Sequence, residues 1–437
     1  MKILHLITRL ILGGAQENTV LSCEGQRQAG HDVTLAFGPI YGPEGSLRDR
    51  AEKSGCKLVE LSAMKRAILP GADWRCYRQC LRLIRETRPD VVHTHSSKAG
   101  IIGRMAAWQL GVPAVIHTIH GLPFHPYQSR LKNAIYIAAE RKAARRCHRI
   151  VTVADAMTRQ ALAAGVGRPE QYVTIYSGME VEHYLHTPGS TAPAPGSGSD
   201  GRPPEATSDE ETGISASPIR NQKSEIRNSL GPDPGSSDSR AAVRAELGFT
   251  DDDVVIGTVA RLAELKGHDD LLDTLPTLPV NVKLLWVGDG WWRARLEKRI
   301  AAMGMAGRVV MTGLVPAEQV ARHMRAMDVL VHPSYREGLP RTVPQGLLSG
   351  VPVVSYDCDG AGEACISDQT GLLVKTGDVP ALGRAMAWMV DHPAERRVMA
   401  DRGRALCVKR FDWRVMVTEL DRLYRQVLQA DHVSNDE

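Results

Sequence analysis

Short apolar runs alternate with longer helical stretches on both sides of a polar central segment. The predicted strands span residues 2–8, 32–36, 91–94, 114–118, 149–153 and 173–175 before that segment, and residues 254–259, 283–287, 309–312, 329–332, 353–356 and 372–374 after it. This alternation is typical of βαβ units. We therefore expect an α/β protein with two doubly wound parallel-sheet domains, and we expect its chemistry in the loops that follow the strands.

The central segment, residues 187–240, has a composition of its own. Of its 54 residues, 26 are Pro, Gly or Ser, and none is aromatic. Such a segment buries too little apolar surface to offset its chain entropy, so we expect a disordered insertion at a domain junction. The predicted division is an N-terminal domain over 1–186, the insertion, a second domain over 241–410 and a final helix over 411–430 that crosses back to the first domain.

Composition narrows the class of protein. The chain of 437 residues has no apolar run of about 18 residues or more, which disfavours a transmembrane helix. Residues 1–14 are interrupted by His5 and Arg9, and they favour a buried first strand over a signal peptide. Eight cysteines without CxxC pairs indicate reduced thiols, and hence a cytoplasmic protein.

The net charge of +4 conceals an asymmetry, because residues 1–186 carry a net +10 and residues 241–437 a net −3. Much of the excess lies in a helix-like stretch over residues 127–149. Its apolar positions are spaced as on one helix face, at Leu131, Ala134, Ile135 and Ala138. Two interpretations stay open: a core-facing helix with a solvated basic face, or attachment to an anionic membrane surface. Nucleic-acid binding is disfavoured, since only 5% of the chain is aromatic.

Gly13 and Gly14 follow the first predicted strand and precede a helix. Glycines at that place let backbone N–H groups approach an anion, although a simple tight turn is an equal alternative. The pattern is not GxGxxG, so a dinucleotide site is not indicated.

Histidines gather at two neighbouring predicted strands, at positions 93, 95, 117 and 120. Alternation places His93 and His95 on one strand face. We expect polar substrate contacts at the strand ends, with structural hydrogen bonding as the alternative. A metal site is disfavoured because no carboxylate or cysteine joins them at ligand spacing.

Two cations follow the first strand after the insertion. Arg261 stands at its carboxyl end, and Lys266 lies close to the start of the next helix. This pair suits a diphosphate and would stabilise it as a leaving group, whereas the alternative is a solvated charge pair.

The segment 333–340, PSYREGLP, and Gln345 resemble the donor-site signature of retaining glycosyltransferases of family 4, which have the two-Rossmann-domain GT-B fold. The resemblance implies that Glu337 contacts sugar hydroxyls. The family's second glutamate, which contacts the ribose, is replaced here by Gln345. The amide keeps hydrogen-bonding capacity but loses about 1–2 kcal/mol of charge-assisted strength.

The resemblance covers nearly the whole chain apart from the insertion, and it implies two domains facing each other across a cleft. It implies catalytic roles for His120, Glu337, Arg261 and Lys266. Donor or nucleotide binding is implied for the same Arg261, Lys266 and Glu337 and for Gly13, Gly14, Gly288, Gly313, Leu314, Gly338, Leu339, Pro340 and Gln345.

The implied reaction moves a sugar, with retention, from a UDP- or GDP-linked donor to a saccharide or lipid-linked acceptor, as in polysaccharide or glycolipid synthesis. We expect no cofactor and no metal, and we expect a cytoplasmic protein that attaches peripherally to the inner face of the membrane. The triplet Asp357-Cys358-Asp359 has the form of the DxD metal motif of another glycosyltransferase fold, but it lies where family 4 has a glycine-rich loop.

Two alternatives stay open. A nucleotide-sugar epimerase would use the same diphosphate contacts but would interconvert donor isomers without an acceptor. A nucleotide-sugar-binding protein without catalysis is favoured only by Gln345.

Overall fold

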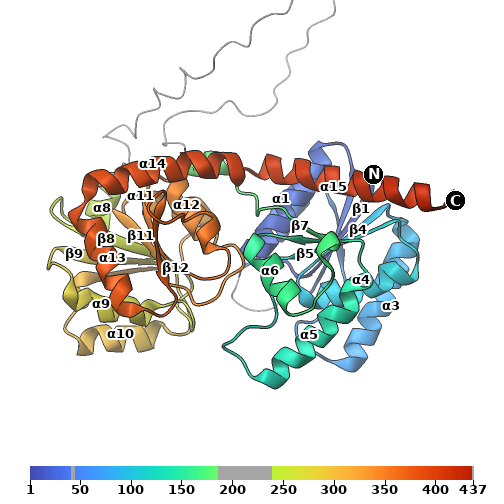
Figure 1. Cartoon of the computed structure of the whole chain (residues 1–437), viewed down its shortest axis with the longest axis horizontal. Helices are drawn as coiled ribbons and strands as arrows, with labels where there is room; N and C mark the ends of the chain where they lie inside the picture. The colour runs from blue at the N-terminus through green and yellow to red at the C-terminus, as the bar shows by residue number, and fades with distance from the viewer. Residues whose placement is uncertain (41–44, 186–238, 436–437) are drawn as a thin grey trace, which may run out of the picture. The chain divides into compact units, whose positions relative to one another are not determined.

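The computed structural model describes residues 1–40, 45–185 and 239–435 (Figure 1). The predicted insertion lies outside the described residues except at its last two positions. The described residues of 1–185 and 251–435 form one compact unit by their contacts, and residues 239–250 belong to a second unit. In the second unit the described part contains helix α8 (Arg240–Glu246), which Ser239 caps by accepting a hydrogen bond from the backbone N–H of Ala242.

The N-terminal half contains a seven-stranded parallel sheet in the order β3-β2-β1-β4-β5-β6-β7. Its strands are β1 (Lys2–Arg9), β2 (Asp32–Gly38), β3 (Lys57–Glu60), β4 (Val91–His95), β5 (Ala114–Ile119), β6 (Arg149–Thr152) and β7 (Tyr172–Thr174). Its helices are α1 (Gly14–Gln28), α2 (Arg48–Lys53), α3 (Pro70–Thr87), α4 (Ser97–Gln109), α5 (Arg130–Ala144), α6 (Asp155–Ala163) and α7 (Val181–Leu185).

The C-terminal half contains a six-stranded parallel sheet in the order β10-β9-β8-β11-β12-β13. Its strands are β8 (Val254–Val259), β9 (Val282–Val287), β10 (Val309–Gly313), β11 (Val329–His332), β12 (Val353–Asp357) and β13 (Gly371–Lys375). Its helices are α9 (His268–Thr274), α10 (Arg293–Ala302), α11 (Ala317–Arg325), α12 (Thr342–Leu348), α13 (Val379–Asp391) and α14 (Pro393–Arg410), and α15 (Trp413–Asn435) ends the chain.

The fold class is confirmed, because both sheets are parallel and share the doubly wound order. Every predicted strand is present with bounds within two residues. One strand was not predicted. β3 is a four-residue edge strand with two exposed ends, so it lacks a continuous apolar run.

Helix α15 packs on the N-terminal sheet, although it follows the C-terminal sheet in sequence. Its buried residues Met416, Leu420 and Tyr424 belong to the same apolar cluster as Ile3 and Ile7 of β1. Hence residues about 400 positions apart share one core. Helix α15 contacts both α1 and strand β5 (Figure 1).

Candidate active site

An ion pair stands at the carboxyl ends of β8 and β11. Lys266 Nζ lies 2.5 Å from Glu337 Oε1, and both side chains are largely buried. His332 Nε2, at the end of β11, lies 3.4 Å from the same oxygen. Burial alone would raise the pKa of Glu337, but the Lys266 ammonium and His332 outweigh burial and hold that pKa well below its usual range. Glu337 is therefore a carboxylate at neutral pH.

The ion pair lines a cavity of about 510 Å³. Among the predicted site residues, those that line this cavity are Gly14, Arg261, Lys266, Glu337, Leu339 and Pro340. The Arg261 guanidinium lies over the ring of Trp291, 5.7 Å from its centroid. The cations Arg261, Lys266 and Arg341 and the carboxylates Glu264 and Glu337 thus line a hollow that extends from the start of α1 to the start of α12.

The loop after β11 lies directly against the loop after β5. A Cβ atom on Gly338 would stand 1.9 Å from the carbonyl oxygen of His120, so only glycine allows this approach. Arg336 adds a contact by donating to the carbonyl oxygen of Leu122, at 2.5 Å. These contacts place Glu337 and His120, which are 217 positions apart, on adjoining loops.

His120 lines a second cavity of about 310 Å³, together with Ser96, Gly121 and Arg336. Burial, with a smaller contribution from the Arg341 charge, lowers the pKa of His120 to about 3. The imidazole is neutral at pH 7, so it carries one N–H and one acceptor nitrogen.

Gly13 is the residue before α1, and Gly14 is the first residue of that helix. The group beside Gly14 is Arg341, because a Cβ atom there would lie 2.7 Å from its Cδ. Arg341 also pairs with Glu17 of α1, at 3.1 Å, and donates to the carbonyl oxygen of Gly178, at 3.0 Å.

The remaining predicted donor residues do not line the cavity that contains Lys266 and Glu337. Gly288 and Gly313 pair through a backbone hydrogen bond of 3.1 Å at the ends of β9 and β10. Leu314, which follows, is 74% exposed. Gln345 is buried within α12.

The triplet Asp357-Cys358-Asp359 is engaged within the protein. Asp359 Oδ2 accepts from the backbone N–H of Glu337 at 2.6 Å, and its Oδ1 accepts from Gln160 at 2.8 Å. Asp359 therefore fixes the backbone of the loop that carries Glu337.

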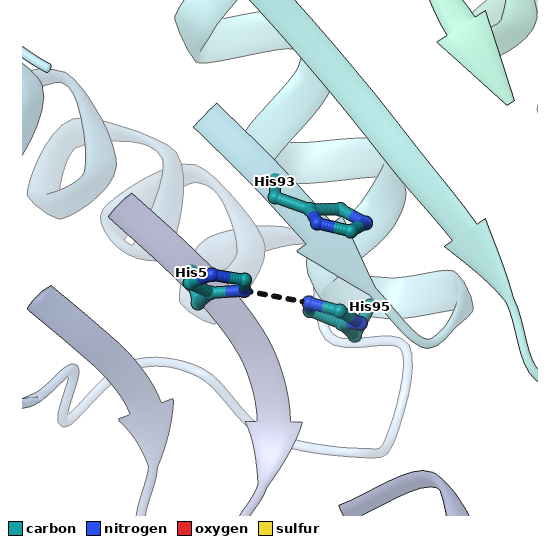
Figure 2. Close-up of side chains that lie close together, drawn as sticks. All are labelled: His5, His93 and His95. Carbon is teal, nitrogen blue, oxygen red and sulfur yellow. Dashed lines mark hydrogen bonds between the residues drawn. The ribbon is translucent and has the colours of Figure 1, made fainter. Parts of the chain in front are cut away.

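His5, His93 and His95 form a buried cluster on β1 and β4 (Figure 2). The shared strand face predicted for His93 and His95 is present, with ring centroids 4.3 Å apart. Both side chains are fully buried and hydrogen-bonded inside the protein, so the expected substrate contact is wrong and the structural alternative holds. Among the described residues this is the one group with metal-ligand character, yet each ring has a hydrogen-bond partner at 2.5–3.0 Å.

Several residues of the site were missed by sequence reasoning. These residues are His332, Arg336, Arg341, Trp291 and Asp359. Arg336 and Arg341 flank the recognised EGLP residues, so proximity to that motif was the available signal. For His332 the signal was its place at the end of a buried strand, and for Trp291 it was the loop that follows β9.

The apolar positions of α5 face outward, which corrects the core-facing interpretation. Leu131 is 73% and Ile135 54% exposed, and Ala134 and Ala138 are exposed as well. The inner face carries Glu140, which accepts a hydrogen bond of 2.7 Å from the buried Arg104 of α4. Ala143 and Ala144 are buried on the same inner face, while the apolar stripe lies at the surface. No helix in the described ranges is long and apolar enough to span a bilayer.

Two doubly wound parallel sheets with a cavity at the strand ends have the arrangement of the GT-B fold. The chain matches the family of glycosyl transferases group 1 over residues 239–406 and the glycosyl transferase 4-like domain over residues 13–178. The chain belongs to this glycosyltransferase family.

Relatives of known name agree. The chain is 26% identical to the 2-deoxystreptamine glucosyltransferase of Streptomyces kanamyceticus, over 72% of each chain. It is 22% identical to the UDP-Gal:alpha-D-GlcNAc-diphosphoundecaprenol alpha-1,3-galactosyltransferase of Escherichia coli, over 90% of this chain and 88% of that protein. A shorter match, at 29% identity, covers 64% of the 2-deoxystreptamine N-acetyl-D-glucosaminyltransferase of Streptomyces fradiae and 70% of this chain.

A solved structure with the same fold is that of Anabaena Alr3699/HepE in complex with UDP-glucose. The TM-score is 0.73 at 19% identity, over 98% of this chain and 100% of that one. At this identity the likeness concerns the fold.

Proposed function

We propose that this glycosyltransferase moves a hexose from a UDP-linked donor to a saccharide or lipid-linked acceptor, with retention of configuration. The observation that carries the proposal is the Lys266–Glu337 pair beside Arg261 at one cavity. A UDP-glucose complex of a protein with this fold and the UDP-galactose donor of a relative favour UDP.

In the proposed mechanism Arg261 and Lys266 hold the diphosphate and stabilise its charge as it leaves. The Glu337 carboxylate accepts hydrogen bonds from sugar hydroxyls and keeps Lys266 in place. His120, neutral and on the adjoining loop, contacts the transferred sugar from the other side. Attack by the acceptor on the face from which UDP departs gives retention.

We further propose that the reaction needs neither cofactor nor metal. The two cations supply positive charge at the diphosphate, and the Asp359 carboxylate accepts hydrogen bonds from the protein through both oxygens. Activity that survives extensive treatment with EDTA would support this point, and activity restored only by Mg²⁺ or Mn²⁺ would contradict it.

The donor is tested by thermal denaturation with a panel of nucleotide sugars. We expect stabilisation by a UDP-sugar, because a ligand that binds only the folded state raises the melting temperature. Lys266→Met should abolish this shift, while Lys298→Met, at an exposed position on α10, should leave it intact. A shift that Lys266→Met preserves would remove Lys266 from the donor site.

Catalysis is tested by release of UDP with acceptor extracts. Release that depends on acceptor supports transfer. Interconversion of donor isomers without acceptor would indicate an epimerase, and tight binding without release under every condition would indicate a binding protein.

On the acceptor side we propose that α5 attaches to an anionic membrane surface. Ala138 of its exposed apolar stripe lines a hollow of about 610 Å³, which shares Trp108, Arg141 and Arg145 with a second hollow of about 670 Å³. Trp108 is 43% exposed. Exposed apolar groups beside cations match the chemistry of anionic lipid headgroups and the acyl chains beneath them.

A further inference from the structure

A chain of hydrogen bonds runs through the core of the N-terminal half to His120. Gln26 Oε1 lies 2.7 Å from His5 Nε2, and His5 Nδ1 lies 2.9 Å from His95 Nε2 (Figure 2). His95 Nδ1 lies 3.0 Å from His120 Nε2. Gln26 is on α1, His5 on β1 and His95 on β4, so three elements align the four side chains.

The chemistry of the first member determines the proton positions in all the others. An amide oxygen only accepts, so His5 Nε2 must carry the proton. A neutral imidazole has one N–H, so His5 Nδ1 then accepts from His95 Nε2–H, and His95 Nδ1 in turn accepts from His120 Nε2–H. Burial keeps the rings neutral: it lowers the pKa of His5 to about 4 and the pKa of His95 well below its usual range.

The final helix sets the orientation of the Gln26 amide. Gln26 Nε2 donates to Tyr424 Oη at 3.2 Å, and Tyr424 Oη lies 2.5 Å from His93 Nδ1. Burial raises the pKa of Tyr424, so its hydroxyl keeps its single proton. When that proton goes to His93, the hydroxyl oxygen accepts from the amide NH₂, and the amide oxygen must face His5.

We propose that Tyr424, Gln26, His5 and His95 are positioning residues that hold His120 in the Nε2–H tautomer. His120 Nδ1 is then the acceptor nitrogen available to a hydroxyl of the bound sugar. This use of His120 rests on the proposed function, whereas the tautomer itself does not. A residue of the C-terminal helix thereby decides the proton position on a ring at the active site.

The tautomer is measured directly by ¹H–¹⁵N NMR of protein labelled at histidine, without substrate. We expect His5, His95 and His120 of the wild type to show the Nε2–H pattern at pH 7.5. An Nδ1–H pattern or an imidazolium at His120 would overturn the proposal. Loss of the N–H signals with one bound equivalent of Zn²⁺ would also overturn it, because a metal would replace those protons.

Gln26→Met keeps the length of the side chain but removes the acceptor. We expect His120 to become a mixture of tautomers and kcat to fall by about 10- to 100-fold, with KM for the donor changed less than about twofold. Gln171→Met is the matched control, because Gln171 is also buried and hydrogen-bonded in this half but touches none of these histidines. A folded Gln26→Met protein with an unchanged His120 tautomer would contradict the relay.

Tyr424→Phe provides a second variant if Gln26→Met does not fold. Without the hydroxyl the Gln26 amide can rotate, so the mixture of tautomers should appear again, and an unchanged pure Nε2–H pattern would contradict the role of Tyr424. If neither variant folds, the wild-type spectrum alone decides. An inactive wild-type protein with the expected tautomer would contradict the proposed function and leave the relay standing.

Discussion

The two halves of the chain share one strand order but bury different chemistry. Around β8–β13 the core is apolar, with Trp286 and Tyr356 among its largest buried side chains. Around β1, β4 and β5 the core contains fully buried histidines bonded to one another. The C-terminal half places its charges at strand ends, where Lys266 and Glu337 line a cavity.

The two halves thus use different polar groups near the candidate active site, although both have a doubly wound parallel sheet. An ion pair at a cavity is charged over a wide pH range and acts directly on a ligand. Neutral rings in a core act only through hydrogen bonds, because desolvation removes their charge. Function at the ion pair should therefore be sensitive to loss of either charge. The hydrogen-bonded histidines should be sensitive to pH and to replacement of the acceptor Gln26.

The largest effect that we expect is that low pH destabilises the N-terminal half before the C-terminal half. Burial lowers the pKa of the histidines in this half, namely His5, His93, His95, His117 and His120. The unfolded chain binds these protons below its histidine pKa of about 6.5, so stability is complete above that pH and falls as the pH drops. Each histidine contributes up to about 1.4 kcal/mol per pH unit.

Hydrogen exchange at pH 7.5 and 5 measures this effect in each half. We expect the strands β1, β4 and β5 to lose protection at pH 5 while β8 and β11 retain it. His268, whose pKa burial lowers to about 4, is the corresponding group in the C-terminal half. Equal loss of protection in both halves would show that the buried histidines do not dominate.

Removing one charge should break the C-terminal site without unfolding it. Glu337→Gln removes the partner of Lys266, and we expect the rate of UDP release to fall by about a thousandfold, or about 4 kcal/mol. Glu297→Gln, in an exposed pair with Arg293, is the control and should keep the wild-type rate. A loss of less than about tenfold would exclude Glu337 from the proposed role.

The N-terminal half also contains a buried ion pair, in contrast to its neutral histidines. Arg104 and Glu140 form this pair, and Glu140 lines the cavity of about 310 Å³ that contains His120. Glu140→Gln should reduce the free energy of unfolding by about 3 kcal/mol, because the Arg104 charge stays buried without its counterion. Urea denaturation measures this, and the exposed pair of Glu297 serves again as control, with a change below about 0.5 kcal/mol.

A smaller effect is expected where α5 meets a membrane. The double variant Leu131→Asp and Ile135→Asp should bind vesicles of anionic lipid at least about tenfold more weakly, with its melting temperature unchanged, since both residues are exposed. Val280→Asp, also at an exposed apolar position but in the C-terminal half, should bind like the wild type. Equal sedimentation of the wild type with neutral and anionic vesicles would contradict the membrane proposal.

The smallest effect concerns Gln345. Gln345→Ala should weaken donor binding by about 3- to 10-fold, the size of one neutral hydrogen bond, in isothermal titration with the UDP-sugar. Gln319→Ala on α11 provides the control. Unchanged affinity would remove the ribose contact inferred from the family pattern.

The two parallel sheets and charged residues of the candidate site could be predicted from the sequence. Strands with continuous apolar runs were recognised, Arg261 and Lys266 were inferred from their place after a strand, and the resemblance to family 4 added Glu337. Sequence reasoning did not find β3, whose pattern is too short, or Arg336 and Arg341, whose partners lie more than 150 positions away. It also expected His93 and His95 to contact substrate, although both side chains are buried and hydrogen-bonded within the protein.

The sequence by itself determined the two parallel sheets, because strand and helix periodicities are local and each segment carries its own pattern. It also determined the residues at the strand ends, since chain order and sheet order are linked in doubly wound folds. Only the tertiary structure decided which way α5 faces, because its inner face, with Glu140, Ala143 and Ala144, packs against a partner, Arg104 of α4, that lies 36 positions earlier. The contact of Tyr424 with Gln26 and His93 joins positions more than 300 residues apart, and no local pattern encodes which polar atoms such a core brings together.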